Sequence, residues 1–282
     1  MRLAVLSDVH GNLPALEAVL QDMRRFDPDG LIVAGDLTGG PHTCQTLALL
    51  RAARARMIRG NGAALLLKYA AGGGPAAWHE ALQFGMLRWD CRRIDAETLA
   101  LLRSLPDQRT VEIPGAGSIR VVHGSPRHPA ESIYPERDPG LLALALEMTA
   151  EPVLVCGHTH EPWSRVLDGK LALNPGAVCG PLNGFVGAQY ALLSWDGFHW
   201  AVEHHAVPYD VGPVRAAFAA SGLLDEGGAL ARAFLRSIET GRDVALAFLS
   251  HAYSLAKAEG CGDCEFVPDG AWQRAADTFD WE

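Results

Sequence analysis

The chain has 282 residues, 49% of them hydrophobic, and its acidic residues outnumber its basic ones to give a net charge of −9. This length fits one large α/β domain or one domain with an appendage, and the negative charge argues against nucleic acid duplexes or anionic membranes as partners. The first apolar run is too short for a signal peptide and ends at Asp8. No stretch reaches the roughly 20 apolar residues of a membrane span. The six cysteines are scattered along the chain, as is typical of reduced thiols. We therefore expect a cytoplasmic protein.

The first part of the chain predicts alternating strands and helices. Residues 2 to 7 form an apolar run that ends at Asp8, a helix follows, and residues 31 to 34 form a second buried strand that ends at Gly35-Asp36. This order is typical of a parallel βαβ unit. Ligands of such sheets bind at the carboxyl ends of the strands, where these aspartates lie.

The remaining segments predict a helical insert, further strands and a helical carboxyl-terminal extension. Residues 63 to 105 are expected to be helical and to cover the mouth of the site. Residues 110 to 122 predict a hairpin, residues 141 to 149 a helix and residues 153 to 156 a buried strand, and antiparallel strands are expected between 165 and 207. Residues 213 to 282 predict helices, one of which has an apolar face at Val244, Phe248, Ala252 and Leu255. Either the core or a second subunit must cover this face, so a homodimer is one expectation.

Five short motifs carry the chemistry of this chain. They are Asp8-Val9-His10, Gly35-Asp36, Gly60-Asn61, Val122-His123-Gly124 and Gly157-His158-Thr159-His160. Each lies where a predicted strand ends, and together they supply carboxylate, imidazole and amide ligands of the kind that divalent transition metals bind. The set can hold two metal ions that share one carboxylate, an arrangement suited to in-line displacement at phosphorus.

These motifs resemble those of the calcineurin-like metallophosphoesterases, in particular a bacterial branch of phosphodiesterases and diadenosine-tetraphosphatase-related proteins. Leu105-Pro106, Asn174-Pro175-Gly176 and Val207-Pro208-Tyr209-Asp210 add to the resemblance, which extends to about residue 211. It implies a metallophosphoesterase domain at 1–212, with the 63–105 insert near its site, and an extension at 213–282. With the strand pattern, it implies a four-layer α-β-β-α sandwich of two mixed sheets with flanking helices.

The resemblance also implies a role for each motif residue. Asp8, His10 and His160 are expected to bind a first metal ion, and Asn61, His123 and His158 a second, with Asp36 as the bridge between them. Asp36, Asn61 and His123 are the expected catalytic residues. Asn12 and His128 are candidate substrate contacts. The cofactors are expected to be two divalent ions from the group Mn, Fe, Zn, Ni and Co, with Mn favoured.

The third motif departs from the family pattern. The family has a histidine after the asparagine, which protonates the leaving group, whereas this chain has Gly62. General acids are typically worth ~10²–10⁴ in rate, so the substitution favours substrates with acidic leaving groups. The expected function is metal-dependent hydrolysis of a phosphodiester or nucleotide-type ester. A Ser/Thr protein phosphatase-like monoesterase and a non-catalytic metal-binding scaffold for protein partners remain as alternatives.

Overall fold

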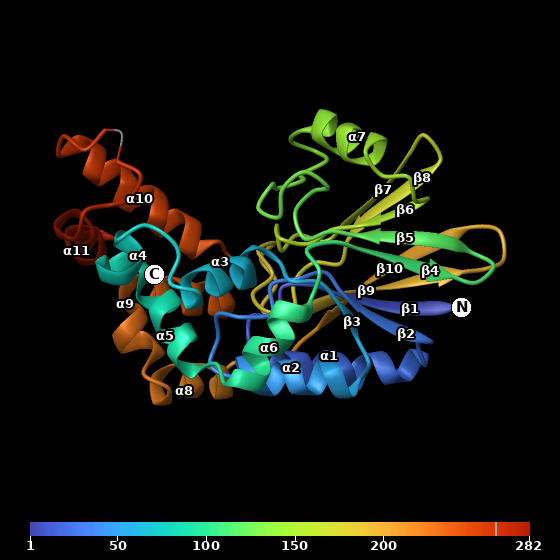
Figure 1. Cartoon of the computed structure of the whole chain (residues 1–282), viewed down its shortest axis with the longest axis horizontal. Coiled ribbons are helices and arrows are strands. Elements are labelled where there is room, and N and C mark those ends of the chain that lie inside the picture. Colours follow the sequence, from blue (N-terminus) through green and yellow to red (C-terminus); the bar gives the residue numbers. More distant parts are fainter. Residues whose placement is uncertain (263) are drawn as a thin grey trace.

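The computed structural model describes residues 1–262 and 264–282. Within them, two five-stranded mixed sheets pack face to face with helices outside, and a further group of helices adjoins one end of this sandwich (Figure 1). The predicted four-layer α-β-β-α sandwich with a helical extension is confirmed.

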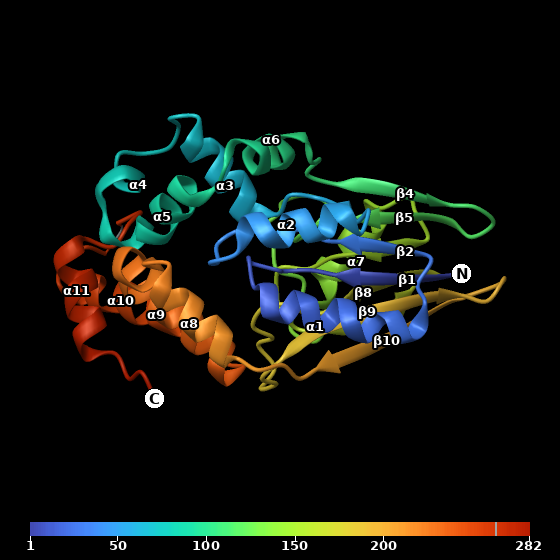
Figure 2. The same ribbon diagram turned by 90° about the horizontal axis from the view of Figure 1, so that it is seen from below.

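The first sheet combines the three amino-terminal strands with two strands from later in the chain, in the order β10-β9-β1-β2-β3. Its strands are β1 (Arg2–Leu6), β2 (Gly30–Val33), β3 (Arg56–Met57), β9 (Ala188–Trp195) and β10 (Trp200–Val207). Strands β1, β2 and β3 run parallel, as the βαβ pattern predicted, and β9 runs antiparallel to β1 and β10. Helices α1 (Leu13–Met23) and α2 (Thr43–Ala52) cover its outer face (Figure 2).

The second sheet has the order β4-β5-β6-β8-β7. Its strands are β4 (Arg109–Ile113), β5 (Gly117–Val121), β6 (Val153–Val155), β7 (Trp163–Leu167) and β8 (Lys170–Asn174). The predicted hairpin is β4 and β5, and helix α7 (Pro139–Glu147) packs on the outer face. Strands β5, β6 and β8 are parallel, so their carboxyl ends meet at one edge.

Strand β1 shows how the sequence builds the layers. Successive side chains of a strand point to opposite faces, so Leu3 and Val5 pack between the two sheets while Ala4 and Leu6 pack against the outer helices. All four are buried, which explains why this strand reads as a continuous apolar run without alternation.

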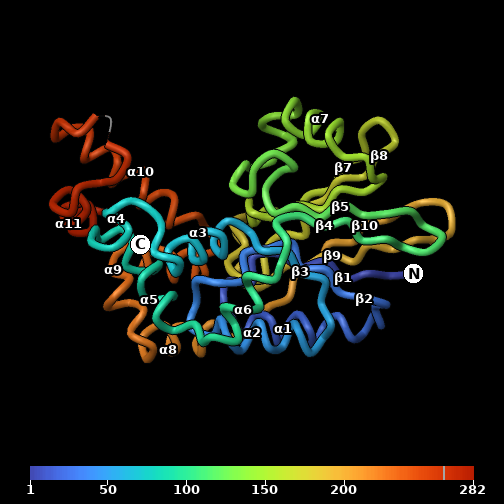
Figure 3. The backbone as a smooth tube through the Cα atoms, viewed as in Figure 1, coloured from blue at the N-terminus to red at the C-terminus, as the bar shows by residue number. Residues whose placement is uncertain are grey.

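The first helices of the insert and the extension lie side by side at the end of the sandwich, whereas the last helix of the insert lies beside α2 (Figure 3). The insert contains α3 (Asn61–Ala70), α4 (Ala77–Glu80), α5 (Gly85–Arg93) and α6 (Ala96–Ser104), and the extension contains α8 (Gly212–Ala220), α9 (Leu223–Thr240), α10 (Val244–Ala258) and α11 (Asp269–Thr278). Two 3₁₀ turns, Arg24–Phe26 and Leu82–Phe84, complete the helical elements of the described residues. The Leu82 amide donates to Asp269 Oδ1 at 2.8 Å, and the Val267 amide donates to Gln83 Oε1 at 2.8 Å, so hydrogen bonds from backbone amides to side-chain oxygens join the two segments.

The apolar face of α10 is covered within the chain. Phe248 packs edge-on against Trp272 of α11 at 5.0 Å between ring centroids and stacks with Trp281 at 5.3 Å. Ala252 and Leu255 belong to the same cluster as Ala233 of α9. This face therefore gives no reason to expect a homodimer, which stays a prediction without structural support. Among the described residues, no helix has the length and apolar character needed to cross a membrane.

Candidate metal centre

The structure brings all seven predicted metal ligands to the carboxyl ends of strands. Asp8 and His10 follow β1, Asp36 follows β2, Asn61 opens α3 after β3, His123 follows β5, and His158 and His160 follow β6. Backbone hydrogen bonds tie these loops together, including Asp8 N to Gly35 O at 3.1 Å, Asp36 N to Arg59 O at 3.0 Å and Gly157 N to His123 O at 2.7 Å. Ligands from both sheets therefore converge on one site.

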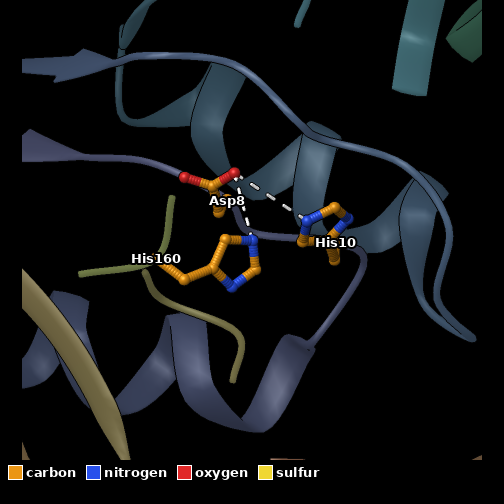
Figure 4. A group of neighbouring side chains, drawn as sticks. All are labelled: Asp8, His10 and His160. Atoms are coloured by element: carbon orange, nitrogen blue, oxygen red, sulfur yellow. Dashed lines mark ion pairs between the residues drawn. The ribbon is translucent and has the colours of Figure 1, made fainter. Parts of the chain in front are cut away.

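Two groups of potential ligand atoms form within this site. In the first, Asp8, His10 and His160 place their ligand atoms within 4.8 Å of one another. Figure 4 shows both imidazole rings directed at one oxygen of Asp8, with Nε2 of His160 at 3.3 Å and Nε2 of His10 at 3.9 Å from Oδ1. The second group is Asp36, His123 and His158, also within 4.8 Å.

Asp36 lies between the two groups. Its Oδ2 is 3.8 Å from Nε2 of His10 in the first group and 3.3 Å from Nε2 of His123 in the second. Its Oδ1 accepts a hydrogen bond from the Gly62 amide at 2.9 Å, which fixes the orientation of the carboxylate. This is the position that a bridging carboxylate requires.

Backbone carbonyl groups fix the orientation of three histidines. The Nδ1 atoms of His10, His123 and His160 lie 3.0, 2.7 and 2.8 Å from the carbonyl oxygens of Thr38, Ala34 and Gly180. A carbonyl can only accept, so each Nδ1 carries the proton and each Nε2 offers a lone pair when the ring is neutral. This is the usual arrangement of histidines that bind metals.

Three buried polar atoms of the predicted ligands have no hydrogen-bond partner. They are Asp8 Oδ1, Asn61 Oδ1 and His123 Nε2. Burying such an atom without a partner costs about 1–3 kcal/mol, or more when it is charged. All three are ligand types for a divalent cation, so the donor set fits the two ions that the sequence predicts.

Backbone strain is concentrated at this site. Five predicted ligands have left-handed φ values, namely Asp8 (55°), His10 (43°), Asp36 (46°), His158 (69°) and His160 (57°). Only three further non-glycine residues in the described part of the chain have left-handed φ values. Such conformations cost about 1–3 kcal/mol each and occur mainly where function requires them. The strained backbone conformations of this fold therefore occur mainly at the predicted metal ligands.

Two glycines allow the ligand loops to approach closely. A Cβ at Gly60 (φ 87°) would lie 2.3 Å from the Asp36 nitrogen, and a Cβ at Gly35 (φ 99°) would lie 2.7 Å from Nδ1 of His123. The glycines of the Gly-Asp and Gly-Asn motifs are therefore required by packing between the ligand loops.

The carboxylates of the site stabilise positive charge. Burial alone would raise the pKa of Asp8, but His160, His123 and His10 outweigh it and hold this pKa far below its usual range. Burial likewise opposes protonation of His123, but Asp36 and Asp8 dominate and raise the pKa of His123 to about 9. A proton on His123 therefore compensates the carboxylates where a cation would otherwise do so.

We expect metal binding to release a proton at neutral pH. Since the pKa of His123 is about 9, its ring is protonated near neutrality in the metal-free chain, and a cation can bind Nε2 only after this proton leaves. Affinity should therefore rise with pH up to about 9 and then level off. Despite burial, the Asp8 carboxylate also raises the pKa of His160, so calorimetric titration with Mn²⁺ in two buffers of different ionisation enthalpy should show at least about one proton released per chain. Buffer-independent heats would contradict this expectation.

The structure does not bring the two predicted substrate contacts into the site cavities. Asn12 is buried and caps α1: its Oδ1 accepts from the Ala15 amide at 3.1 Å, and its Nδ2 donates to the Tyr209 hydroxyl at 2.9 Å. His128 is exposed, and its Nδ1 accepts from the Ala130 amide. Neither residue lines the two cavities at the ligand groups. Their contacts with substrate stay predictions that the geometry does not support.

Two cavities open onto the ligand groups. One, of about 240 Å³, is lined by ligands together with Phe234, Ser237 and Asp243 of the extension. The other, of about 400 Å³, extends from His10, Asp36 and Asn61 between the insert and the extension. Phe234 lies against the imidazole of His10 at 5.3 Å between centroids. The extension supplies no residue to the two ligand groups, but it forms walls of both cavities.

Asp90 is a residue of the site that none of the five sequence motifs contains. It lies on α5, lines the larger cavity and is 5% exposed, with Oδ1 lacking a hydrogen-bond partner. Burial raises its pKa to about 7, against the opposing hydrogen bonds from Gly39, Thr43 and Thr38. The only sequence signal was an acidic residue between Trp89 and Cys91 in a helix that was expected to pack against the site.

Replacing Asp90 with asparagine should stabilise the protein at high pH. Because the folded-state pKa is raised, the carboxyl favours folding most below its unfolded pKa of about 4, and this contribution is lost as pH rises through about 7. Asp90→Asn keeps the shape without the charge, so its gain in unfolding free energy should reach a few kcal/mol at pH 8 and shrink at pH 5. Urea denaturation at both pH values checks this, and a difference that does not change with pH would contradict it.

Comparisons with known proteins agree with this geometry. Residues 1–197 match the family described as the calcineurin-like phosphoesterase superfamily domain. An uncharacterized protein from Methanocaldococcus jannaschii is 27% identical over 229 residues, which cover 74% of this chain and 88% of that protein.

Two solved structures share the fold over most of the chain. A metallophosphoesterase from Sphaerobacter thermophilus has a TM-score of 0.67 and 30% identity, and the match covers 86% of this chain and all of that one. A hypothetical protein from Pyrococcus horikoshii has a TM-score of 0.71 and 20% identity, covering 85% of this chain and 98% of that one. The match to both extends beyond the two sheets.

Proposed function

Because the chain belongs to the calcineurin-like phosphoesterase superfamily, we propose that it hydrolyses phosphodiester or related nucleotide-type esters with two divalent metal ions. The observation that carries this proposal is the pair of ligand groups with Asp36 between them. When bound, two such ions activate a water for in-line attack at phosphorus and neutralise charge on the phosphoryl oxygens.

The residues of the chain hold and orient this assembly. Asp8, His10 and His160 would hold one ion, and Asn61, His123 and His158 the other, with the Asp36 carboxylate between them. Four of these ligands are oriented before the ions bind, because backbone carbonyls orient three of the rings and the Gly62 amide orients Asp36. Such preorganisation lowers the reorganisation needed during reaction.

A phosphodiester is favoured over a phosphate monoester by the charge of the site. A monoester dianion would need cationic side chains beside the metals, but no lysine or arginine of the described residues lines either cavity. Arg59 pairs with Asp107 at 2.7 Å, and Arg127 pairs with Glu131. The site therefore lacks the cationic side chains that a Ser/Thr phosphatase-like monoesterase would need to bind its substrate.

The scaffold alternative does not explain the strained backbone and the partnerless buried atoms. A surface that only binds protein partners has no need for five ligand residues with left-handed backbone conformation, or for buried polar atoms without hydrogen-bond partners on Asp8, Asn61 and His123.

We further propose that Mn²⁺ is the native ion and that the partner is a small phosphate ester. The protein would act in the cytoplasm, without a membrane or a nucleic acid duplex as partner.

Turnover of two nitrophenyl substrates tests the proposal. With Mn²⁺, the purified chain should hydrolyse bis-(4-nitrophenyl) phosphate at least about tenfold faster, in kcat/KM, than 4-nitrophenyl phosphate, since only the latter carries a second negative charge that the site leaves unpaired. A preference for the monoester would instead support the phosphatase alternative. Metal-loaded protein that turns over neither substrate would support the scaffold.

A further inference from the structure

The larger cavity continues away from the metal ligands into an apolar space. Beyond His10, Asp36 and Asn61, its walls are formed by the insert on one side and by the extension on the other. From the insert come Leu65 of α3 and Phe84, Met86 and Leu87 around the start of α5. From the extension come Leu230 and Phe234 of α9 and Leu249 of α10.

The size of this space suits an organic group larger than a methyl. Its volume is about 400 Å³, whereas an apolar cavity of about 150 Å³ already binds benzene. Leu65, Phe84, Phe234 and Leu249 are each only partly buried by the protein, so their remaining apolar surface faces an open space. A ligand that covered this surface would gain hydrophobic free energy.

The charge of the cavity selects against polyanions. Its polar residues beyond the metal ligands are Thr38, Gln83 and Asp90, and no lysine or arginine of the described chain lines it. A nucleoside polyphosphate would place several negative charges there with no cation to meet them. Unpaired charges in an apolar site are strongly disfavoured.

We propose that the substrate is a phosphate ester whose non-leaving substituent is an uncharged apolar group, seated between the insert and the extension. This inference rests on the proposed function and specifies its substrate class. The two ligand groups hold the single anionic phosphorus centre, while Leu65, Phe234 and Leu249 contact the apolar substituent. The insert and the extension thereby determine which ester is selected.

A series of phosphonates tests this substrate class. The 4-nitrophenyl esters of methyl-, butyl- and hexylphosphonate share one leaving group and differ only in the group that would enter the cavity. Full burial is worth up to about fourfold per methylene, so kcat/KM should rise by at least about 30-fold from methyl to hexyl. The free alkylphosphonates, measured by calorimetry on the Mn²⁺-loaded protein, should show the same order of affinity.

Matched variants on one helix locate the effect. Leu249 and Leu246 both lie on α10, but Leu249 lines the cavity and Leu246 is 59% exposed to solvent. Leu249→Gln should lower the hexyl-to-methyl ratio at least about threefold, whereas Leu246→Gln should leave this ratio as in the parent. Leu65→Gln changes the opposite wall and should act like Leu249→Gln, so the test does not depend on one variant folding.

Each outcome decides between the two proposals. Rising affinity without turnover would support the apolar subsite and contradict the esterase function. Turnover that does not vary with chain length, or a loss of preference equal in Leu246→Gln and Leu249→Gln, would overturn the apolar subsite and leave the esterase function standing. Tighter binding of ADP than of hexylphosphonate would also overturn it, and failure to bind any phosphonate would overturn both.

Discussion

Asp36→Ala should reduce the metal content from two ions to fewer than one tightly held ion per chain. Asp36 is the carboxylate whose Oδ2 faces both His10 and His123, so its loss removes a ligand from each ion. Changing residues that merely orient ligands typically costs 10–100-fold in metal affinity or activity, so loss of the bridge should lower kcat/KM by more than about 100-fold. Metal analysis after gel filtration and turnover of bis-(4-nitrophenyl) phosphate measure the two effects.

Asp196→Ala provides the control for this change. Asp196 is an exposed carboxylate in the turn between β9 and β10, and its Oδ1 accepts hydrogen bonds from the amides of Phe198 and His199. This variant should keep both ions and the parent activity. Retention of two ions by Asp36→Ala would contradict the bridging role.

The rate of hydrolysis should depend strongly on the pKa of the leaving group. Gly62 stands where the family carries its proton donor, so an alkoxide would depart without protonation. Nitrophenyl esters should therefore be cleaved at least about 100-fold faster than alkyl esters of similar size, in line with the ~10²–10⁴ that general acids supply. A series of aryl and alkyl diesters with one constant non-leaving group gives this dependence.

Gly62→His should help the alkyl esters selectively, by at most ~10²–10⁴. A Cβ at Gly62 would lie 3.3 Å from Asp36 Oδ1 and 3.7 Å from Thr38 Oγ1, so the change requires only a small shift of these atoms. Ala63 is fully buried, so adding a carboxylate there to orient the histidine would destabilise the core, and the single substitution is the appropriate test.

A shallow dependence on leaving-group pKa would show that another group already supplies the proton. His128 is outside both cavities, whereas Asp90 lines the larger one together with Thr38 and Gly62. Asp90→Asn would then be the variant that restores the steep dependence.

The sequence predicted the sandwich and the convergence of the candidate metal ligands because both depend on local patterns. An apolar run that ends in Asp8, Asp36 or His123 indicates both a buried strand and a ligand at its carboxyl end. Parallel strands bring their carboxyl ends to one edge of the sheet, so these ligands are expected to lie close together. The two-ion arrangement followed from these positions and from the resemblance that the five motifs carry.

The second part of the site could not be predicted because it depends on packing between distant segments. The larger cavity forms where Leu65 of the insert faces Phe234 and Leu249 of the extension, more than 160 residues later in the chain. No periodicity in either segment indicates that contact. Asn12 was expected near the substrate, but an asparagine at that position can also cap the following helix, as it does here. Its side chain is held in this orientation by a hydrogen bond to the distant Tyr209 hydroxyl.

If two ions held around Asp36 carry out the hydrolysis, titration of metal-stripped protein with Mn²⁺ should show a requirement for both. Turnover of bis-(4-nitrophenyl) phosphate should be absent without metal, rise as Mn²⁺ is added and reach its plateau at two equivalents per chain. Turnover that survives metal removal, or a plateau at one equivalent, would contradict hydrolysis by two ions.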